Sequence, residues 1–260
     1  MNKYQLSILI AGIRPQNWLK LYQSIEKSFS GSWEIIFVGP YPLPTMLEKF
    51  DNIQYREDWG SPIRGLQIAL TMARGGYISI AADDGIYLEN SLDDVFEMIK
   101  KKGYAEKYLV IGKYFEGPDG WKTMNHPVYY LLNFHDGARS KWIPNHCMLM
   151  NMMVVPKKLL WDLGGWDCEF EVPAMALCDL AVRVSLCKDV EMEISPKAIY
   201  YCNYMVRREG DHGPIHDAQT DVDMPRFKRI WDGEIMPVRD ISLNNWELAP
   251  DRWVRRFGEA

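Results

Sequence analysis

The chain has 260 residues, of which 47% are apolar and 25% are charged, and its formal net charge is −5 at pH 7. This length and composition are typical of one large α/β domain, or of one domain with an extension. The negative charge leaves no overall basic footprint for nucleic acid, so it argues, weakly, against a polyanionic acceptor.

The cysteines and the apolar segments indicate a reduced, cytoplasmic protein. The cysteines are Cys147, Cys168, Cys178, Cys187 and Cys202. Their number is odd, no CxxC pair occurs and their spacing matches no zinc site. The apolar stretch LSILIAG has seven residues, too few to span a membrane, and no signal-peptide cleavage site follows it. We therefore expect reduced thiols, no transmembrane segment and a cytoplasmic location.

Strand and helix signals alternate from the N-terminus. Apolar residues 6–11 predict a strand, and Pro15 followed by apolar side chains at helical spacing predicts an amphipathic helix over 15–29. EIIFV at 34–38 predicts a second strand, followed by a loop.

The next segment continues the alternation. Ser61 and Pro62 predict the N-cap and first turn of a helix that ends at Gly75-Gly76. A buried strand over 77–82 follows, and then a helix with a capping-box pattern at Ser91 and Asp94. YLVIGK at 108–113 is typical of another strand. This order predicts a mostly parallel sheet with helices on both faces.

The second half is less regular. Residues 114–146 are rich in aromatic side chains and give no clear period. Beyond them we predict strands at 148–155, 190–194 and 198–202, and helices at 156–163 and about 174–187. From residue 205 onward the chain is charged, with one predicted helix near 225–231. We therefore divide the chain into a domain over 1–204 and a C-terminal extension over 205–260 that packs on it as an irregular tail.

Two adjacent carboxylates, Asp83 and Asp84, end the strand at 77–82. In open α/β sheets, ligands bind beyond the carboxyl ends of the strands. Neighbouring strand residues point to opposite faces, so both carboxylates reach one ligand only if the chain turns, which Gly85 permits. One carboxylate on a hydroxyl and the other on a divalent cation is one interpretation, and a turn cap is the equally weighted alternative. The sequence has no GxGxxG, Walker P-loop or GxSxG motif.

Several segments, in order, resemble family 2 glycosyltransferases, which have the Rossmann-like GT-A fold. SILIAGIR is similar to the first strand and donor loop, WEIIFVGP to the second strand, and SPIRGLQIALTMARGGYISIAADDGIYLENSL to the helix, strand and acidic DXD motif. MNMMVVPKKLLWDLGGWD resembles the strand, helix and acceptor loop that follow, and CDLAVRV lies where the family has a Glu-Asp motif ahead of an arginine. The resemblance covers roughly residues 5–202.

The resemblance implies a transferase that uses a nucleotide-diphospho-sugar, with a UDP-sugar favoured. Asp84 would hold Mn²⁺ or Mg²⁺ against the diphosphate, and Asp83 would face the nucleoside or the donor sugar. Ala11 and Arg14 would lie along the nucleoside, with Arg64 near the base or the diphosphate. A divalent ion would stabilise the charge that gathers on the leaving diphosphate.

The resemblance also assigns the acceptor side. Asp179 would be the general base for the acceptor hydroxyl, and direct displacement with one base inverts the anomeric carbon. The alternative for Asp179 is an ordinary i,i+4 ion pair with Arg183. Trp166 and Asp167 would lie near the acceptor, although core packing explains Trp166 nearly as well.

DHGPIH at 211–216 offers Asp211, His212 and His216. The resemblance implies that a late histidine, here His212, is a further metal ligand. Because Gly213 and Pro214 stand between the two histidines, we predict a surface loop there.

The chain departs from the family at three points. Gly39-Pro40 stands where the family commonly has an aspartate, Gly85 takes the third position of the acidic motif, and only Asp179 is left of the Glu-Asp pair. These departures leave two matters open: how the base of the nucleotide is recognised, and whether Asp179 or a nearby acid, such as Glu169 or Glu171, is the catalytic base.

The sequence thus predicts a metal-dependent GT-A glycosyltransferase that acts on a glycan or other hydroxyl acceptor. The alternative is a non-catalytic sugar-nucleotide or glycan-binding module with a degenerate site. A nucleotidyltransferase is disfavoured, because no GxGTR loop follows the first strand. A nucleic-acid acceptor stays open but is not favoured. The arginines and lysines concentrated in the extension motivate it, and a solvated, salt-bridged tail explains them better.

Overall fold

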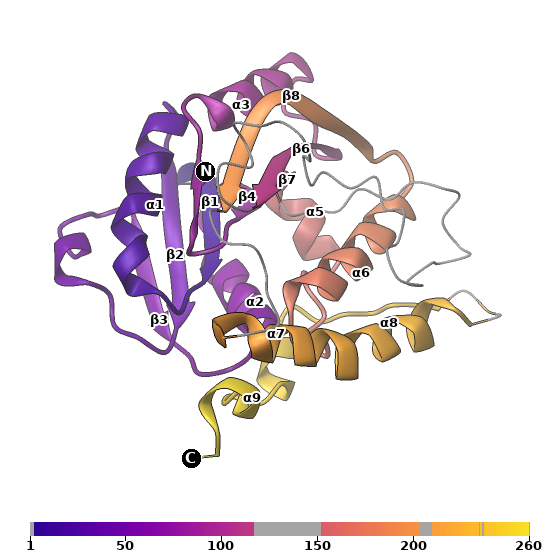
Figure 1. Cartoon of the computed structure of the whole chain (residues 1–260). Helices are drawn as coiled ribbons and strands as arrows, with labels where there is room; N and C mark the ends of the chain where they lie inside the picture. The colour runs from indigo at the N-terminus through magenta and orange to yellow at the C-terminus, as the bar shows by residue number, and fades with distance from the viewer. Residues whose placement is uncertain (1–2, 117–151, 203–209, 234, 236, 260) are drawn as a thin grey trace.

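The computed structural model describes residues 3–116, 152–202 and 210–259, except 234 and 236 (Figure 1). The predicted irregular segment at 114–146 lies largely outside these residues, and so does the start of the strand predicted at 148–155.

An eight-stranded mixed sheet, in the order β3-β2-β1-β4-β7-β6-β8-β5, forms the centre of the described chain. Its first half is parallel: β1 (Tyr4–Ala11), β2 (Trp33–Gly39), β3 (Ile53–Glu57) and β4 (Gly75–Ile80). The second half comprises β5 (Gly85–Tyr87), β6 (Tyr108–Glu116), β7 (Met153–Pro156) and β8 (Glu191–Cys202). Here β7 runs antiparallel to both β4 and β6, whereas β6 and β8 are parallel. The predicted mixed, mostly parallel α/β sheet is confirmed.

Two apolar cores cover the two faces of the sheet, because alternate strand residues point to opposite sides. Ile8, Ile10 and Phe37 pack with α1 (Pro15–Ser28) and α3 (Ser91–Lys101). On the other face, Leu9, Ile36 and the strand residues that point the same way pack with α2 (Pro62–Met72), α5 (Lys157–Asp162) and α6 (Pro173–Ser185). Figure 1 shows this layering, with α1 and α2 on opposite sides of β1.

Three local predictions were wrong, each for an identifiable reason. Gly75-Gly76 does not end α2 but begins β4, where a Cβ on Gly75 would lie 2.6 Å from the backbone nitrogen of Ser7. The N-cap of α3 is Asn90, in the left-handed region at φ 59°, and the Ser91 hydroxyl instead accepts from the Ile199 amide at 3.0 Å. The two predicted closing strands are one strand, β8, with an irregularity in its pairing to β6.

The C-terminal extension is more helical than the sequence predicted. After a 3-10 turn, η3 (Gly210–His212), one nearly continuous run follows: α7 (Gly213–Ala218), the π-helical η4 (Gln219–Asp223) and α8 (Met224–Trp231). The loop predicted for 211–216 is therefore wrong, since Pro214 stands in the first turn of α7. Phe227 and Trp231 are buried in the same core as α6, and Figure 1 shows α7 and α8 crossing beneath that helix.

The last described elements are η5 (Asn245–Leu248) and α9 (Val254–Phe257). A short 3-10 helix, η1 (Thr45–Leu47), lies between β2 and β3. Among the residues that the structure describes, no helix has the length and apolar character to cross a bilayer. No disulfide joins the four described cysteines.

Candidate functional site

A cavity of about 440 Å³ opens where the parallel strands end. Its floor consists of the residues that follow β1, β2, β3 and β4: Ala11–Arg14, Val38–Pro40, Asp58 with Gly60–Pro62, and Ile80–Asp84. The opposite wall comes from α6, β6, β8, η3, α7 and the start of α9. This is the position at which open α/β sheets bind ligands, and the volume lies in the range of small-molecule sites. We call it the strand-end cavity.

Close backbone packing shapes one side of this cavity. A Cβ on Gly39 would lie 1.9 Å from the carbonyl oxygen of Gly12, so no acidic side chain fits at the end of β2. Asp58, just after β3, lies beside this position, because its amide donates to the Gly39 carbonyl at 3.2 Å. The chain therefore presents a carboxylate to this part of the cavity from β3 rather than from β2.

Asp83 holds the loop between β1 and α1. Its Oδ2 accepts from the amides of Ile13 and Arg14, both at 2.6 Å, and its Oδ1 accepts from Nη1 of Arg14 at 2.5 Å. Burial raises the pKa of Asp83, an effect that the charge of Arg14 partly offsets. Asp83 lines the cavity, as the sequence predicts, but its oxygens are engaged by this loop.

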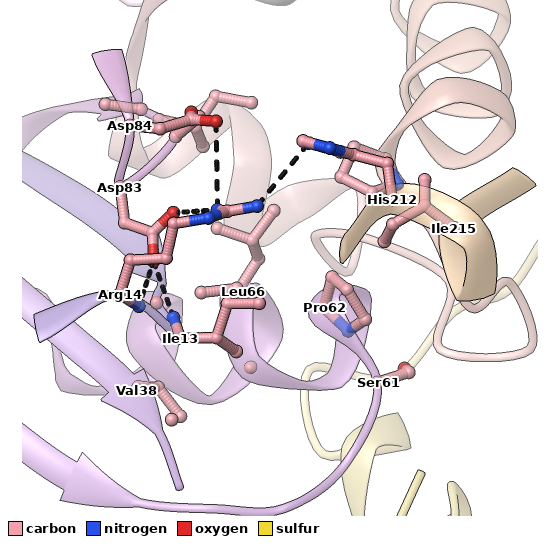
Figure 2. Close-up of a pocket in the computed structure, with 18 of the residues that line it drawn as sticks. Ile13, Arg14, Val38, Ser61, Pro62, Leu66, Asp83, Asp84, His212 and Ile215 are labelled. Carbon is pink, nitrogen blue, oxygen red and sulfur yellow. Dashed lines mark hydrogen bonds and ion pairs between the residues drawn. The ribbon is translucent and has the colours of Figure 1, made fainter. Parts of the chain in front are cut away.

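Arg14 lies at the centre of the charged part of the site (Figure 2). Besides Asp83, its guanidinium approaches Oδ2 of Asp84 at 3.8 Å and Nε2 of His212 at 3.4 Å. On its outer side, Nε donates to Asp211 at 2.9 Å, and Nη2 donates to the same carboxylate oxygen. Arg256 from α9 also donates to Asp211, at 2.6 Å. The loop between β1 and α1 is thereby linked to the C-terminal extension.

The electrostatics follow from this arrangement. Burial lowers the pKa of Arg14, but Asp83, Asp84 and Asp211 more than compensate, so the net shift is upward and the side chain stays charged. Burial and then the charge of Arg14 lower the pKa of His212, which favours a neutral imidazole at pH 7. Because an arginine can only donate, a hydrogen bond between Arg14 and the neutral ring requires the tautomer of His212 whose Nε2 carries the lone pair.

β8 supplies the wall behind the acidic pair. The Tyr200 hydroxyl donates to the Ala82 carbonyl at 2.6 Å, and a Cβ on Gly85 would lie 2.1 Å from that hydroxyl oxygen. Gly85 is thus required for the close approach of Tyr200, and its φ is not in the left-handed region. Sγ of Cys202 donates to Oδ1 of Asp84 at 3.5 Å.

A second, more polar cavity, of about 990 Å³, adjoins the first, and Ser61 and Trp253 line both. It lies between the loop at 167–171 and the extension. Asp167 faces it and pairs with Arg239, while Glu169 and Glu171 line it beside Arg226 and Arg255. We call it the extension cavity. Of the predicted acceptor residues, Asp167 lines it and Trp166 does not.

Two predicted site residues are engaged elsewhere. The Arg64 guanidinium pairs with Asp58 at 3.0 Å and donates to the carbonyls of Trp246 and Ala249 in the extension. Arg64 is not among the described residues that line the strand-end cavity. Trp166 is fully buried in the core with α2 and α6, as the alternative for it anticipated.

Asp179 is fully buried on α6, and in the described part of the chain it lines neither the strand-end cavity nor the extension cavity. Its Oδ2 accepts from Nε of Arg183 at 2.8 Å, and its Oδ1 accepts from the Trp231 indole at 3.0 Å. The i,i+4 pair that the sequence offered as the alternative is therefore present. A further arginine, Arg239, approaches Oδ1 at 3.6 Å.

Asp84 and His212 are the predicted metal ligands, and both line the strand-end cavity. A carboxylate and a neutral imidazole suit Mn²⁺, and Mg²⁺ often takes only one or two protein carboxylates plus phosphate oxygens. Among the residues that the structure describes, no group of three or more His, Cys, Asp or Glu is placed to hold a metal ion. The donor set thus fits an ion that is held jointly with a diphosphate, and is too small to hold one alone.

Three solved structures of S. aureus TarS 1-349 have a similar fold. The structure of TarS 1-349 alone matches with a TM-score of 0.58 at 17% identity, over 76% of this chain and 60% of the solved chain. The complex with UDP matches with 0.56 at 15% identity over 76% and 60%, and the complex with UDP-GlcNAc with 0.55 at 17% over 80% and 60%. This chain therefore spans 60% of the length of those solved chains.

These identities show the fold alone, and it is the mixed α/β, GT-A-like fold that the sequence resemblance implied. No protein-family model matches the chain, and no curated protein matches its sequence. Assignment to family 2 stays a prediction.

Several residues of the cavity escaped the sequence analysis. Asp58, Tyr200, Trp253 and Arg256 all line it. Asp58 had a usable signal, because it is an acid shortly before the helix N-cap Ser61. The other three carry no local motif, and they reach the cavity only through the pairing of β8 with β5 and the return of the C-terminal segment.

Proposed function

We propose that this protein is a glycosyltransferase that moves a sugar from a nucleotide-diphospho-sugar, with UDP as the nucleotide, to an acceptor hydroxyl. The observation that carries the proposal is the strand-end cavity, where Arg14, Asp84 and His212 converge on one point at the carboxyl ends of parallel strands. The fold supports it, because the similar TarS structures were solved with UDP and with UDP-GlcNAc.

The nucleoside fits the part of the cavity between β1 and β2. Ala11, Val38 and Leu66 give it an apolar lining, and Asp58 is the carboxylate beside it. A carboxylate accepts hydrogen bonds, so Asp58 suits the ring N–H of a uracil. The diphosphate would then extend toward Arg14 and Asp84. Arg64 orients Asp58 through its ion pair, so its contribution to the base is indirect.

Asp84 and His212 would hold Mn²⁺ or Mg²⁺. When bound, such an ion supplies positive charge to the leaving diphosphate. Arg14, anchored by Asp83 and Asp211, adds a permanent charge at the same end of the cavity. Tyr200 and Asp83 fix the backbone on both sides, so these charges are preorganised, which is the main source of this kind of stabilisation.

The acceptor would enter through the extension cavity, which meets the strand-end cavity at Ser61 and Trp253. A general base must lie within hydrogen-bond reach of the acceptor hydroxyl. Glu169 and Glu171 face this cavity, whereas Asp179 is enclosed in its pair with Arg183. We therefore place the base at Glu171 or Glu169 in preference to Asp179. Displacement with a single base proceeds with inversion.

The test is nucleotide binding by thermal shift, with UDP-, GDP-, dTDP- and CMP-sugars, each with and without Mn²⁺. Ligand at ~100 times its dissociation constant adds about 2.7 kcal/mol of stability. We expect a raised midpoint with the UDP-sugar. Asp84→Ala removes the response, while Asp162→Ala, a surface acid paired with Lys158, retains it. No shift with any nucleotide, or wild-type transfer by Asp84→Ala, would refute the proposal.

A non-catalytic module that binds nucleotide-sugars is the second candidate. The burial of Asp179 in an ion pair favours it, because the residue at the family's base position is engaged. The same samples separate the two, since a module binds the UDP-sugar but shows neither transfer nor donor hydrolysis. Loss of transfer in Glu171→Gln or Glu169→Gln, by ~10²–10⁴-fold with UDP binding intact, identifies an enzyme and its base.

A further inference from the structure

We propose that Arg14 is a resident cation of the metal site: in the donor-free protein its guanidinium occupies the place between Asp84 and His212, and a divalent ion enters only together with the diphosphate. This rests on the proposed function and deepens it, because it says how one chain residue controls the access of the metal.

The geometry around Arg14 carries the proposal. Nη1 lies 3.8 Å from Oδ2 of Asp84 and Nη2 lies 3.4 Å from Nε2 of His212. Figure 2 marks both contacts with dashed lines. The carboxylate oxygen and the imidazole lone pair that would bind a metal thus point at the guanidinium. A divalent ion between them would lie within a few ångströms of a permanent positive charge, and like charges at that distance repel each other, the more so where water is excluded.

The contacts of Arg14 are unequal, and the inequality indicates how the site is released. Toward the loop and the extension the guanidinium is held tightly, at 2.5 Å from Asp83 and 2.9 Å from Asp211. Toward Asp84 and His212 the contacts are longer. The two longer contacts are the ones that the guanidinium gives up first, while the contacts with Asp83 and Asp211 keep it anchored. A diphosphate favours this release, because it offers the guanidinium new oxygen acceptors and gives the ion the ligands that the protein lacks.

The ligand count leads to the same conclusion. Within the described chain, no group of three or more His, Cys, Asp or Glu side chains is placed around a metal position. Since Mg²⁺ takes an octahedron of oxygen ligands, two protein ligands leave most positions to water and phosphate. A metal ion that meets both too few ligands and a competing cation should bind weakly until the nucleotide arrives.

The experiment measures Mn²⁺ binding to the purified full chain by electron paramagnetic resonance of the free ion, with and without UDP. The variants are Arg14→Met and, as the charge-matched control, Arg256→Met. Arg256 pairs with the same Asp211, and its charge lowers the pKa of His212 less than that of Arg14 does. Within the described residues, no hydrogen bond or ion pair joins Arg256 to Asp84 or His212. Both variants remove one positive charge from the network, but only Arg14→Met clears the place between the two ligands.

The expected result is that wild type binds Mn²⁺ at least ~10-fold more weakly without UDP than with it, because the repulsion is relieved only in the complex. Arg14→Met binds Mn²⁺ without UDP at least ~10-fold more tightly than wild type, and Arg256→Met behaves like wild type. Because Arg14→Met leaves the buried Asp83 without its cation, the double variant Arg14→Met, Asp83→Asn repeats the measurement if the single variant does not fold.

If UDP binds to wild type, and wild type binds Mn²⁺ equally well with and without UDP, the inference is overturned while the proposed function stands. It is also overturned if neither Arg14 variant gains affinity, or if Arg256→Met gains as much. If UDP binds to no variant under any condition, the proposed function fails, and the inference falls with it.

Discussion

The parallel half of the sheet and the C-terminal extension are held in place by different forces. In the first half, β1–β4 with α1 and α2 bury aliphatic and aromatic side chains on both faces, and Leu9 and Ile36 are fully enclosed. The extension, residues 210–259, contributes Phe227 and Trp231 to the core and packs Trp253 against Val172, and it adds several ion pairs to the rest of the chain.

The charged contacts of the extension meet the functional residues. Asp211 pairs with Arg14, Arg239 with Asp167, and Arg255 with Glu171. The first half thus builds the floor of the strand-end cavity with apolar packing, whereas the extension closes it with ion pairs. Screening by a salt such as NaCl weakens ion pairs between exposed charges, whereas it acts little on apolar packing. Substitutions that act on one region at a time test this difference.

The largest expected effect comes from Asp179→Asn. The change leaves Arg183 buried beside a neutral group, and removing one partner of a buried pair costs about 3–5 kcal/mol. It also weakens the acceptor for the Trp231 indole, which docks α8. Chemical denaturation should show the loss in the free energy of unfolding, and UDP binding should survive in the folded fraction.

The outcome for Asp179→Asn also separates the two roles of this residue. A variant of wild-type stability that has lost transfer would show that Asp179 is the catalytic base after all, as the family resemblance implies. Asp162→Asn is the control for the loss of a carboxylate, since its pair with Lys158 lies on the surface, where such pairs contribute about 0–1 kcal/mol.

A cavity in the first half should have the next largest effect. Leu9→Ala on β1 removes a fully buried side chain, and such changes cost about 2–5 kcal/mol. Because the lost term is apolar, the deficit should be the same at low and high salt. Arg255→Met, which breaks the pair with Glu171, is the comparison in the extension, and its loss of unfolding free energy should shrink at high salt. If the loss in Leu9→Ala changes with salt just as much, the two regions are not held by different forces.

The first half of the fold was predictable because its signals are local. Apolar runs of strand length, the Ser61 cap and Pro15 all carry their meaning within a few residues, and the predicted elements there agree with the structure to within a few residues at most boundaries. β3 and β5 were missed, because β3 alternates weakly and β5 has only three residues. The helix predicted near 225–231 agrees with α8. The helical segment before it, α7 and η4, was missed, because Gly213-Pro214 is a typical loop signal unless the proline falls in the first turn.

The site was less predictable, because its residues come together only through the fold. Asp83, Asp84, Arg14 and His212 were named from the sequence and converge in the structure. Their mutual pairing was not foreseen, since nothing local indicates that Arg14 faces the acids. Gly85 was named as a turn residue, yet its small size serves the approach of Tyr200 from a strand over 100 residues later.

The docking of the extension should depend on pH through Asp223. This buried carboxylate accepts from the amides of Glu171 and Val172, both at 2.9 Å, and burial raises its pKa to about 6. The folded state therefore binds this proton more tightly than the unfolded state, so the contribution is complete below the ordinary pKa of 3.8 and is lost as the pH rises through about 6. A shift of this size corresponds to about 3 kcal/mol at most.

Asp223→Asn isolates that contribution. The side-chain amide places an NH₂ group opposite a backbone N–H, so the variant is less stable than wild type at every pH. Between about pH 4 and about pH 6.5, the unfolding free energy of wild type should fall by the Asp223 contribution, and that of the variant should not. Carboxyl NMR titration of wild type gives the pKa directly. If the pKa of Asp223 is ordinary, the hydrogen bonds from the two backbone amides offset the effect of burial on that pKa. Docking of the extension would then not depend on pH through Asp223.

The smallest effect is expected at the point where the two regions meet. Ser61 caps α2, with its hydroxyl accepting from the Arg64 amide at 3.3 Å, and it lines both cavities. Ser61→Ala should cost about 1 kcal/mol in the free energy of unfolding, and Ser61→Thr should restore most of it, because threonine also caps. Since the cap lies within the first half, the loss should be insensitive to salt and should leave proteolysis of the extension unchanged. Faster cleavage of the extension in Ser61→Ala, but not in Ser61→Thr, would contradict this. It would show that the cap also holds Arg64 against the carbonyls of Trp246 and Ala249, so that α2 takes part in docking the extension.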